Sequence, residues 1–269
     1  ALPTGNYCID LEEYGDYHFM SAAGVVLPDT SICFTVGSSS QADLIHTYYI
    51  PYFTSGGVYN YWSGLGVSNN NELSPATIQI TTFNSNGTIL ATSPRETIAA
   101  NGQFSNVLAA GQTATGWARI DSSEELSGLS FMGFSFMGSS IMADVPFVSE
   151  LSTALMIPHM AQDNSWDTHA LVCNPNNTPA VITLTFISPT GQAHISAPQP
   201  LGAYCSATYP LSTIFANYLP LPRGKVKLTV TQGDGICAFA LYKNQKTGGH
   251  CFAGISADPL LPSGPIHPF

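Results

Sequence analysis

The chain has 269 residues and a formal net charge of -10, and only 9% of its residues are charged. So few charged residues disfavour a fold of surface helices, whose solvent faces need Glu, Lys, Arg and Gln. Seven Lys and Arg cannot form the dense basic face that nucleic acid requires, and no run approaches the ~18 to 20 apolar residues of a membrane helix. We therefore expect an all-β protein with no nucleic-acid partner and no membrane span.

Residues 1–46 form an acidic N-terminal segment that we expect to be an extension or an assembly arm. They contain no Lys or Arg, and their acidic residues are Asp10, Glu12, Glu13, Asp16, Asp29 and Asp43. The segment predicts one or two short strands, broken at Leu27-Pro28. Two roles stay open: an extra pair of strands on the first domain, or an arm for something else. The acidic run lacks the spacing and glycine of an EF-hand, which favours a solvated loop over a calcium site.

The rest of the chain is an internal duplication. Residues 49–70 and 156–176 both carry Ile-Pro, a polar loop, Trp and an apolar run that ends on Asn. Each copy is followed by an alternating strand ending in Phe, and later by a matched strand at residues 116–120 or 224–228. The separation between matched positions stays at roughly 100 to 111 residues, which is a domain-sized period. We expect two tandem β-sandwich domains, residues 47–150 and 151–269.

Alternating apolar residues and turn signals predict the individual elements. In the first copy we expect strands near residues 65–67, 76–83, 88–91, 116–121, 126–136 and 141–145. The pairs Asn86-Gly87 and Asn101-Gly102 are typical of turns between them. The second copy predicts the same order, with one helical turn at residues 209–220 that is bounded by prolines. The proline-rich C-terminus is expected to trail as an extended tail.

Six cysteines suggest disulfides and an oxidising compartment. They are Cys8, Cys33, Cys173, Cys205, Cys237 and Cys251, without a CxxC spacing. All four cysteines of the second copy align with serines of the first, as expected when paired residues are gained or lost together. Of the 15 connectivities of six cysteines, we expect Cys173–Cys205, Cys237–Cys251 and Cys8–Cys33. Three expected disulfides indicate an oxidising compartment, and the N-terminal sequence Ala-Leu-Pro-Thr-Gly is typical of a mature chain. We therefore expect a protein that is secreted or lies on the cell surface.

The candidate metal site is the loop around Trp166 in the second copy. It carries four potential ligands of zinc or a similar ion: His159, Asp163, Asp167 and His169. The first copy has Tyr52 at the first of these positions and lacks the others. This difference favours a polar loop of solvated side chains over a metal site, so we expect no cofactor.

The sequence contains no catalytic constellation. Residues 133–138 approach the nucleophile elbow of serine hydrolases but lack its second glycine position, and they alternate as a strand does. We therefore expect that the protein is not an enzyme.

Aromatic residues gather in the first copy and form a candidate assembly or binding site. They are Tyr49, Tyr52, Tyr59, Tyr61 and Trp62. Rings on the rim of a β-sandwich can stack on sugars, and an exposed apolar patch usually marks a contact surface. The alternative is that half of the rings belong to the core and the others are scattered on the surface.

At the paired Ile-Pro, Trp and Asn signature and the Gly-Trp-Ala-Arg-Ile element of residues 116–120, the chain resembles secreted bacterial proteins built of tandem immunoglobulin-like β-sandwich repeats. The resemblance covers most of residues 48–255 and brings no catalytic residues with it. It implies an immunoglobulin-like fold and a role on cell surfaces or in appendages.

These observations predict a non-enzymatic, secreted structural protein. The acidic N-terminal segment and a late basic segment, with Arg223, Lys225, Lys227, Lys243 and Lys246, favour self-assembly into a head-to-tail extracellular filament. The alternative is an adhesin or carbohydrate-binding module that uses the aromatic loop near Trp62. The expected partners are therefore copies of the chain itself, or else a glycan or a cell-surface protein.

Overall fold

The computed structural model describes residues 5–11, 30–36, 43–136, 139–163, 165–218, 223–244 and 252–260. Residue contacts divide the chain into two compact units, Ala1–Asp43 and Leu44–Phe269. In the described residues no helix is both long and apolar enough to cross a membrane.

The first unit contains one antiparallel hairpin. Its strands are β1 (Gly5–Leu11) and β2 (Thr30–Val36), and their register sets Cys8 opposite Cys33 and Asp10 opposite Ser31. Glu12, Glu13, Asp16 and Asp29, the other residues of the acidic stretch, lie outside the described residues.

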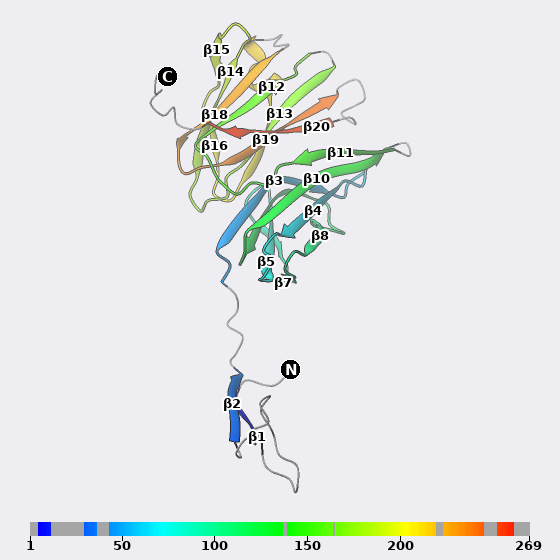
Figure 1. Ribbon diagram of the computed structural model, residues 1–269. Helices are drawn as coiled ribbons and strands as arrows, with labels where there is room; N and C mark the ends of the chain where they lie inside the picture. The colour runs from blue at the N-terminus through cyan, green and yellow to red at the C-terminus, as the bar shows by residue number, and fades with distance from the viewer. Residues whose placement is uncertain are drawn as a thin grey trace, which may run out of the picture. The chain divides into compact units, whose positions relative to one another are not determined.

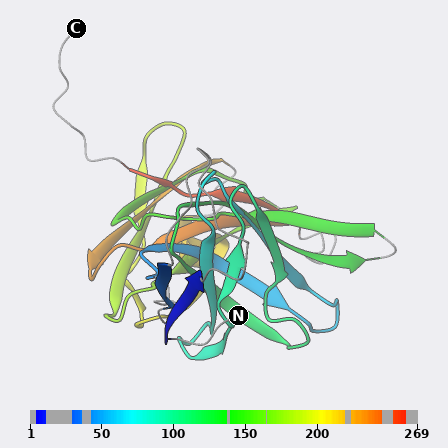
Figure 2. The same cartoon turned by 60° about the horizontal axis from the view of Figure 1, so that its bottom comes forward.

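The second unit contains four antiparallel sheets, which we number as blades (Figure 1). Blade 1 is β3 (His46–Ser55), β9 (Ala114–Ser122), β5 (Ala76–Asn84) and β6 (Ile89–Thr92), with β7 (Glu96–Ile98) beside β5. Blade 2 is β11 (Ser139–Val145), β10 (Leu126–Phe136), β4 (Trp62–Asn69) and β8 (Gln103–Val107). Figure 2 shows the β10–β11 hairpin extending past the neighbouring strands.

The two remaining blades come from the later part of the chain. Blade 3 is β15 (Ala193–Ile195), β14 (Ala180–Ile187), β18 (Gly224–Gln232), β12 (Ala154–Met160) and β21 (Asp258–Pro259), with β16 (Gln199–Leu201) beside β14. Blade 4 is β17 (Ser206–Pro210), β13 (Trp166–Cys173), β19 (Cys237–Asn244) and β20 (Phe252–Ser256). We call residues 44–150 the first half and residues 151–260 the second half.

The expected pair of tandem immunoglobulin-like β-sandwich domains is wrong. The protein is all-β, but its four small sheets are arranged as a four-bladed β-propeller. The sequence alignment of the two halves could not reveal this, because it compares each half with the other and carries no information about how they pack. Residues 44–269 form one compact unit instead.

The strand orders of the two halves correspond. The order β3-β9-β5-β6 of blade 1 matches β12-β18-β14-β15 of blade 3, and β8-β4-β10-β11 of blade 2 matches β17-β13-β19-β20 of blade 4. Strands of blades 1 and 2 alternate along the chain, so neither blade is a continuous segment. Equivalent residues in blades 2 and 4 can therefore be read from the strand registers.

The predicted strands are confirmed, and most are longer than expected. The short prediction at residues 65–67 becomes β4, which starts at Trp62 and ends at Asn69. The predicted helical turn is also confirmed, as α1 (Leu211–Ile214) followed by a 3-10 turn, Ala216–Tyr218. Leu211 and Phe215 of this turn are buried, because their helical spacing points both at the second core.

Blade 4 contributes to two hydrophobic cores, one on each of its faces. Ala170 and Val172 of β13 pack in the core shared with blade 3. Leu171, the residue between them, packs with Phe239 of β19 in the core of the first half. Successive side chains of a strand point to opposite faces, so blade 4 is a buried layer between the first half and blade 3. This double burial is why the halves are one unit.

A third, small core joins the halves around Trp117. The Trp117 ring is fully buried and stacks on Phe83 with centroids 4.1 Å apart. Its Nε1 donates a 2.7 Å hydrogen bond to the carbonyl of Tyr204, which belongs to the second half. Cys173 and Cys237 of the second half complete this core, which therefore contains residues of both halves.

The disulfides expected from the sequence are also wrong for the described residues. Cys173, Cys205 and Cys237 are free cysteines, and no two of these three lie at disulfide distance. Cys173 and Cys237 are directly opposite on β13 and β19, where they fill the small core as apolar residues do. Cys251 lies outside the described residues, and for Cys8 and Cys33 only the backbone register is described. These thiols give no support to an oxidising compartment.

We predict that Trp117→Ala lowers the free energy of unfolding by about 3 to 5 kcal/mol, because it leaves a cavity between the halves. Urea denaturation followed by circular dichroism measures this change. The two halves of the second unit should unfold together in a single transition, since blade 4 packs in the cores of both. Separate unfolding transitions of the two halves would contradict the one-unit architecture.

A second prediction concerns the thiols. Burial raises the pKa of the Cys173 thiol well above its usual value, and the neighbouring Cys237 and Cys205 thiols add to this effect. Iodoacetamide should therefore leave Cys173 and Cys237 unmodified in the native protein, because the reagent attacks accessible thiolates. In denaturant without reductant, all three residues should be alkylated, as read by peptide mass mapping. A disulfide-linked peptide that contains any of the three would contradict the structure.

Candidate functional site

The outer face of blade 2 carries large side chains that lie over glycines. Antiparallel pairing sets Gly133 opposite Trp62, and Phe131 opposite Gly64. A Cβ atom added at Gly64 would lie 2.6 Å from the Phe131 ring, so a larger residue there would displace the ring. The Trp62 and Phe131 rings meet edge to face with centroids 5.4 Å apart. The glycines thus let the rings lie low against the sheet.

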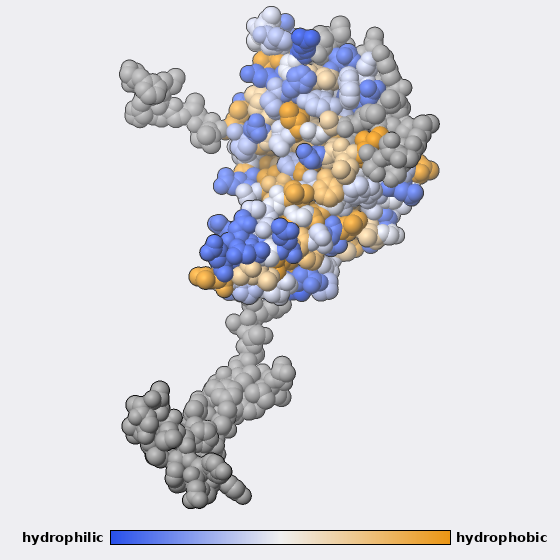
Figure 3. Space-filling view, turned by 45° about the vertical axis from the view of Figure 1, so that its right-hand side comes forward, coloured by the Kyte–Doolittle hydropathy of each residue, from blue (hydrophilic) through white to orange (hydrophobic). Residues whose placement is uncertain are grey.

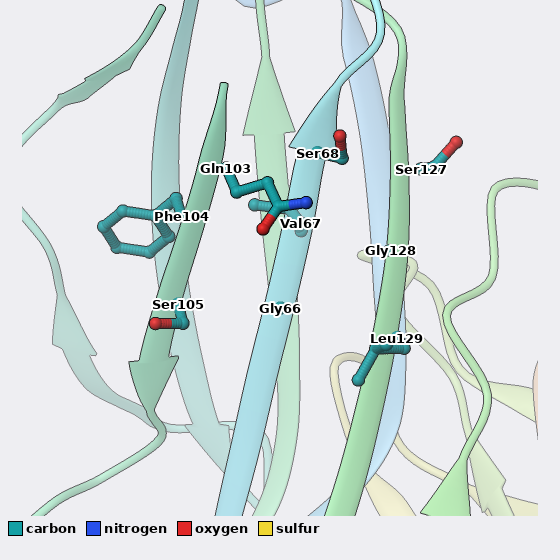
Figure 4. Close-up of a pocket in the computed structure, with 9 residues that line it drawn as sticks. All are labelled: Gly66, Val67, Ser68, Gln103, Phe104, Ser105, Ser127, Gly128 and Leu129. Atoms are coloured by element: carbon teal, nitrogen blue, oxygen red, sulfur yellow. The ribbon is translucent and has the colours of Figure 1, made fainter. Parts of the chain in front are cut away.

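Next to these rings, a shallow groove of about 370 Å³ crosses β8, β4 and β10 (Figure 4). Gly66 leaves its floor open, the side chains of Gln103 and Ser105 border it on β8, and Leu129 borders it on β10. Leu129 lies opposite Gly66 in the strand register. None of the residues that line the groove is charged, so the groove suits an uncharged surface or ligand.

This face is both apolar and exposed. Leu129 is 59% exposed, Met142 of β11 is 57% exposed and Val107 of β8 is 46% exposed. Figure 3, which brings forward the side of the molecule where β10 and β11 lie, shows apolar and neutral residues across the middle of the surface, with hydrophilic residues among and around them. Contiguous exposed apolar patches of this kind usually mark contact surfaces.

The equivalent face of blade 4 is covered by the first half. Cys173 of blade 4 aligns with Ser68 of blade 2, and two residues earlier Leu171 aligns with Gly66. Across the strand pair, Leu171 lies opposite Phe239 and Gly66 lies opposite Leu129. Leu129 is therefore the equivalent of Phe239, which is 0% exposed. The same face of the duplicated sheet is buried in one half and open in the other.

The five aromatic residues predicted as a site do not form one patch. Tyr49 and Tyr52 point at the junction between the halves, with ring centroids 6.5 Å from Trp117 and 6.2 Å from Phe239. Tyr61 packs on Phe134 with ring centroids 4.9 Å apart, and Tyr59 is 37% exposed within the turn of residues 57–60. Trp62 alone belongs to the outer face of blade 2.

Of the four predicted metal ligands, the structure brings two together. His169 Nε2 lies 3.1 Å from Asp167 Oδ2. His159 Nδ1 instead lies 3.1 Å from the Tyr242 hydroxyl, and Asp163 Oδ1 accepts backbone hydrogen bonds from Ser165 and Trp166. Among the residues that the structure describes, no group of three or more His, Cys, Asp or Glu side chains could hold a metal ion.

Asp167 and His169 form a half-buried polar cluster with Ser212 of α1. The Ser212 hydroxyl donates to Asp167 Oδ2 at 3.0 Å, so both partners bind the same carboxylate oxygen. Ser212 is thus not hydrogen-bonded to His169, which a serine nucleophile and its base require. Asp167 Oδ1 and His169 Nδ1 are buried without a hydrogen-bond partner. The cluster lacks the geometry of a catalytic triad.

The electrostatics of this cluster favour an ionised Asp167. Burial acts to raise the pKa of Asp167, but the hydrogen bond and charge of His169 and the hydrogen bonds of Ser212 outweigh it, so the pKa lies below its usual value. Lys243, which is opposite Asp167 on β19, has a pKa lowered by burial and partly restored by the Asp167 charge.

The candidate site on blade 2 was missed in the sequence, although a signal was present. Residues 63–66 read Ser-Gly-Leu-Gly, and residues 127–133 place Ser, Leu, Phe and Gly at alternate positions. Glycine at alternate outward positions of two strands marks places where another group approaches the backbone. Recognising the face required the register that pairs these two segments.

No family model matches the chain, and no curated protein and no solved structure matches it either. Nothing in these comparisons identifies an immunoglobulin-like repeat family. Function must therefore be inferred from the molecule itself.

We predict that the Asp167 cluster makes stability depend on pH in acid. Because the folded-state pKa of Asp167 is lowered, its contribution is present above the usual Asp pKa of about 3.9 and is lost as the pH falls through the folded-state value. Urea unfolding of wild type and Asp167→Asn between pH 7 and roughly pH 3 measures this. The wild type should lose more stability than the variant; parallel curves would contradict the cluster's role.

Proposed function

We propose that this protein is a non-enzymatic structural subunit that joins copies of itself head to tail into an extracellular assembly. The observation that carries the proposal is the open outer face of blade 2, whose duplicate on blade 4 is covered within the chain. Leaving Leu129, Met142 and Val107 in water is unfavourable by roughly 25 cal/mol per Å² of apolar surface. Covering this face with another copy recovers that free energy.

The duplication supports the head-to-tail direction. Within the chain, the first half covers the outer face of blade 4 in the second half. Repeating this relation between molecules brings the second half of one copy onto blade 2 in the first half of the next. Such a contact joins two different surfaces and is heterologous, so it can continue into a filament or close into a ring.

Charge favours the same direction. Arg223, Lys225 and Lys227 lie at alternate positions at the start of β18 and along it, and Arg223 and Lys225 are exposed. In the described part of the chain none of the three is in an ion pair with a carboxylate. Residues 1–43 carry six acidic residues and no basic ones. Opposite charges at the two ends of the chain steer one copy towards the next.

A second candidate function is the binding of a neutral glycan in the blade 2 groove. The amide of Gln103 and the hydroxyls of Ser68, Ser105 and Ser127 border it, and hydroxyl and amide groups match the hydroxyls of sugars. A glycan array on wild type, Gln103→Ala and Trp62→Ala distinguishes this candidate. Binding that both substitutions abolish would favour it over self-assembly.

We predict that Leu129→Lys reduces assembly, because it places a charge in the centre of the apolar face. Light scattering and electron microscopy of the purified protein over a range of concentrations measure assembly. The matched control is Leu73→Lys, since Leu73 is 91% exposed but lies in the turn between β4 and β5. Wild-type protein that stays monomeric throughout would overturn the proposal, and so would equal assembly of both variants.

A further inference from the structure

The free edges of the sheets differ in how they are protected. An edge strand offers unpaired N–H and C=O groups to any other strand, and proteins block such edges with proline, charge, irregular backbone or a covering segment. β8 is the edge of blade 2 beside β4.

The other described edges of the four blades each have at least one protection. β3 contains Pro51 and a register shift between Ile50 and Phe53. β6 has only four residues, and its pairing with β5 shifts register between Thr82 and Phe83. β7 carries Glu96 and follows Pro94, and β15 has only three residues. Prolines also occupy β16 (Pro200), β17 (Pro210) and β21 (Pro259). β11 and β20 cover each other, since a Cβ at Gly254 would clash with the carbonyl of Asp144.

β8 has none of these protections. Its five residues, Gln103–Val107, include no charge and no proline, and its pairing with β4 has no register shift. Every side chain except that of Phe104 is exposed. Among the described strands of the four blades, β8 is thus the one regular, uncharged edge that is longer than three residues and lacks a covering strand.

The hydrogen bonds fix which backbone groups of β8 point outward. Asn69 N–H donates to the Gly102 carbonyl at 3.0 Å, and Leu108 N–H donates to the Ser63 carbonyl at 2.8 Å. Antiparallel strands bond to one neighbour at every second residue, so Phe104 and Asn106 bond to β4. Ser105 lies between them, and its N–H and C=O face the open edge.

We propose that β8 pairs with β8 of a second copy, antiparallel, about a two-fold axis through Ser105. The outward groups of the two Ser105 residues then bond to each other, and Gln103 lies opposite Val107 of the second copy. Val107 N–H already donates to Asn106 Oδ1 at 2.8 Å, so at this position only the Val107 carbonyl is free to accept. The two blades become one continuous sheet.

A second copy fits this edge better than an unrelated strand. The contact is self-complementary, as a two-fold interface must be. Each chain has a net charge of -10, so two copies repel each other in general. β8 itself has no charged residue, so pairing two β8 strands sets no like charges opposite each other. The contact also joins the exposed apolar faces of two blades at Val107. The inference rests on the proposed function, self-assembly. It adds a second, two-fold contact between copies to the head-to-tail contact.

The test is the monomer–dimer equilibrium of the full chain, measured by size exclusion with light scattering. Ser105→Pro removes an outward N–H that makes no bond to β4, so the fold is retained and circular dichroism should be unchanged. Dimer affinity should fall about tenfold or more. Ser105→Thr, which keeps the N–H and favours strands, is the matched control and should dimerise as the wild type does.

A charge-pair experiment tests the two-fold axis itself. Residue 105 meets its own copy, so Ser105→Lys and Ser105→Glu should each weaken dimerisation through like charges. An equimolar mixture of the two should restore it as a heterodimer. Homodimers of either variant as tight as wild type, or no rescue on mixing, would overturn the β8 contact.

The outcomes separate this inference from the proposed function. If the wild type assembles and the Ser105 variants assemble equally, β8 pairing is wrong and self-assembly stands. If Leu129→Lys removes larger assemblies but leaves a dimer that Ser105→Pro dissociates, both are supported. A wild type that is monomeric at every concentration overturns both.

Discussion

The contact of the first half with the outer face of blade 4 is the constraint on which the rest of the structure depends. Trp117 stacks on Phe83, and its indole N–H reaches across to the Tyr204 carbonyl. Leu171 and Phe239 of blade 4 enter the core of the first half beside this contact. Without it, both halves would expose a sheet face, and blade 4 would lose one of its two cores.

The same contact breaks the symmetry of the duplication. Blades 2 and 4 have matching strand orders, but in the part of the chain that the structure describes only blade 4 has its outer face packed in a hydrophobic core. Blade 2 instead carries glycines under large side chains, with an uncharged groove and Leu129 in water. The proposed self-assembly rests on two features of this one sheet, its open face and its unprotected β8 edge.

Much of the local structure could be predicted from the sequence, whereas most of the candidate site could not. Alternation and turn residues located β5, β10 and the turn at α1, because these signals act between near neighbours. The expected disulfide partners of Cys173, Cys205 and Cys237 were wrong, because spacing in the sequence does not give the distance between two cysteines, and these three are free thiols. Tyr49 and Tyr52 were grouped with Trp62 by nearness in sequence, yet successive parts of one segment face different neighbours.

The sequence by itself determined that the chain is all-β, that it repeats, and the approximate positions of several strands, since side-chain alternation and turn chemistry are local. Only the tertiary structure decided that four sheets form one propeller, that the metal-ligand residues do not converge, and that blade 2 keeps an open face. The physical reason is burial: equivalent strands in the two halves have similar patterns, and which face is covered depends on the neighbour packed against it.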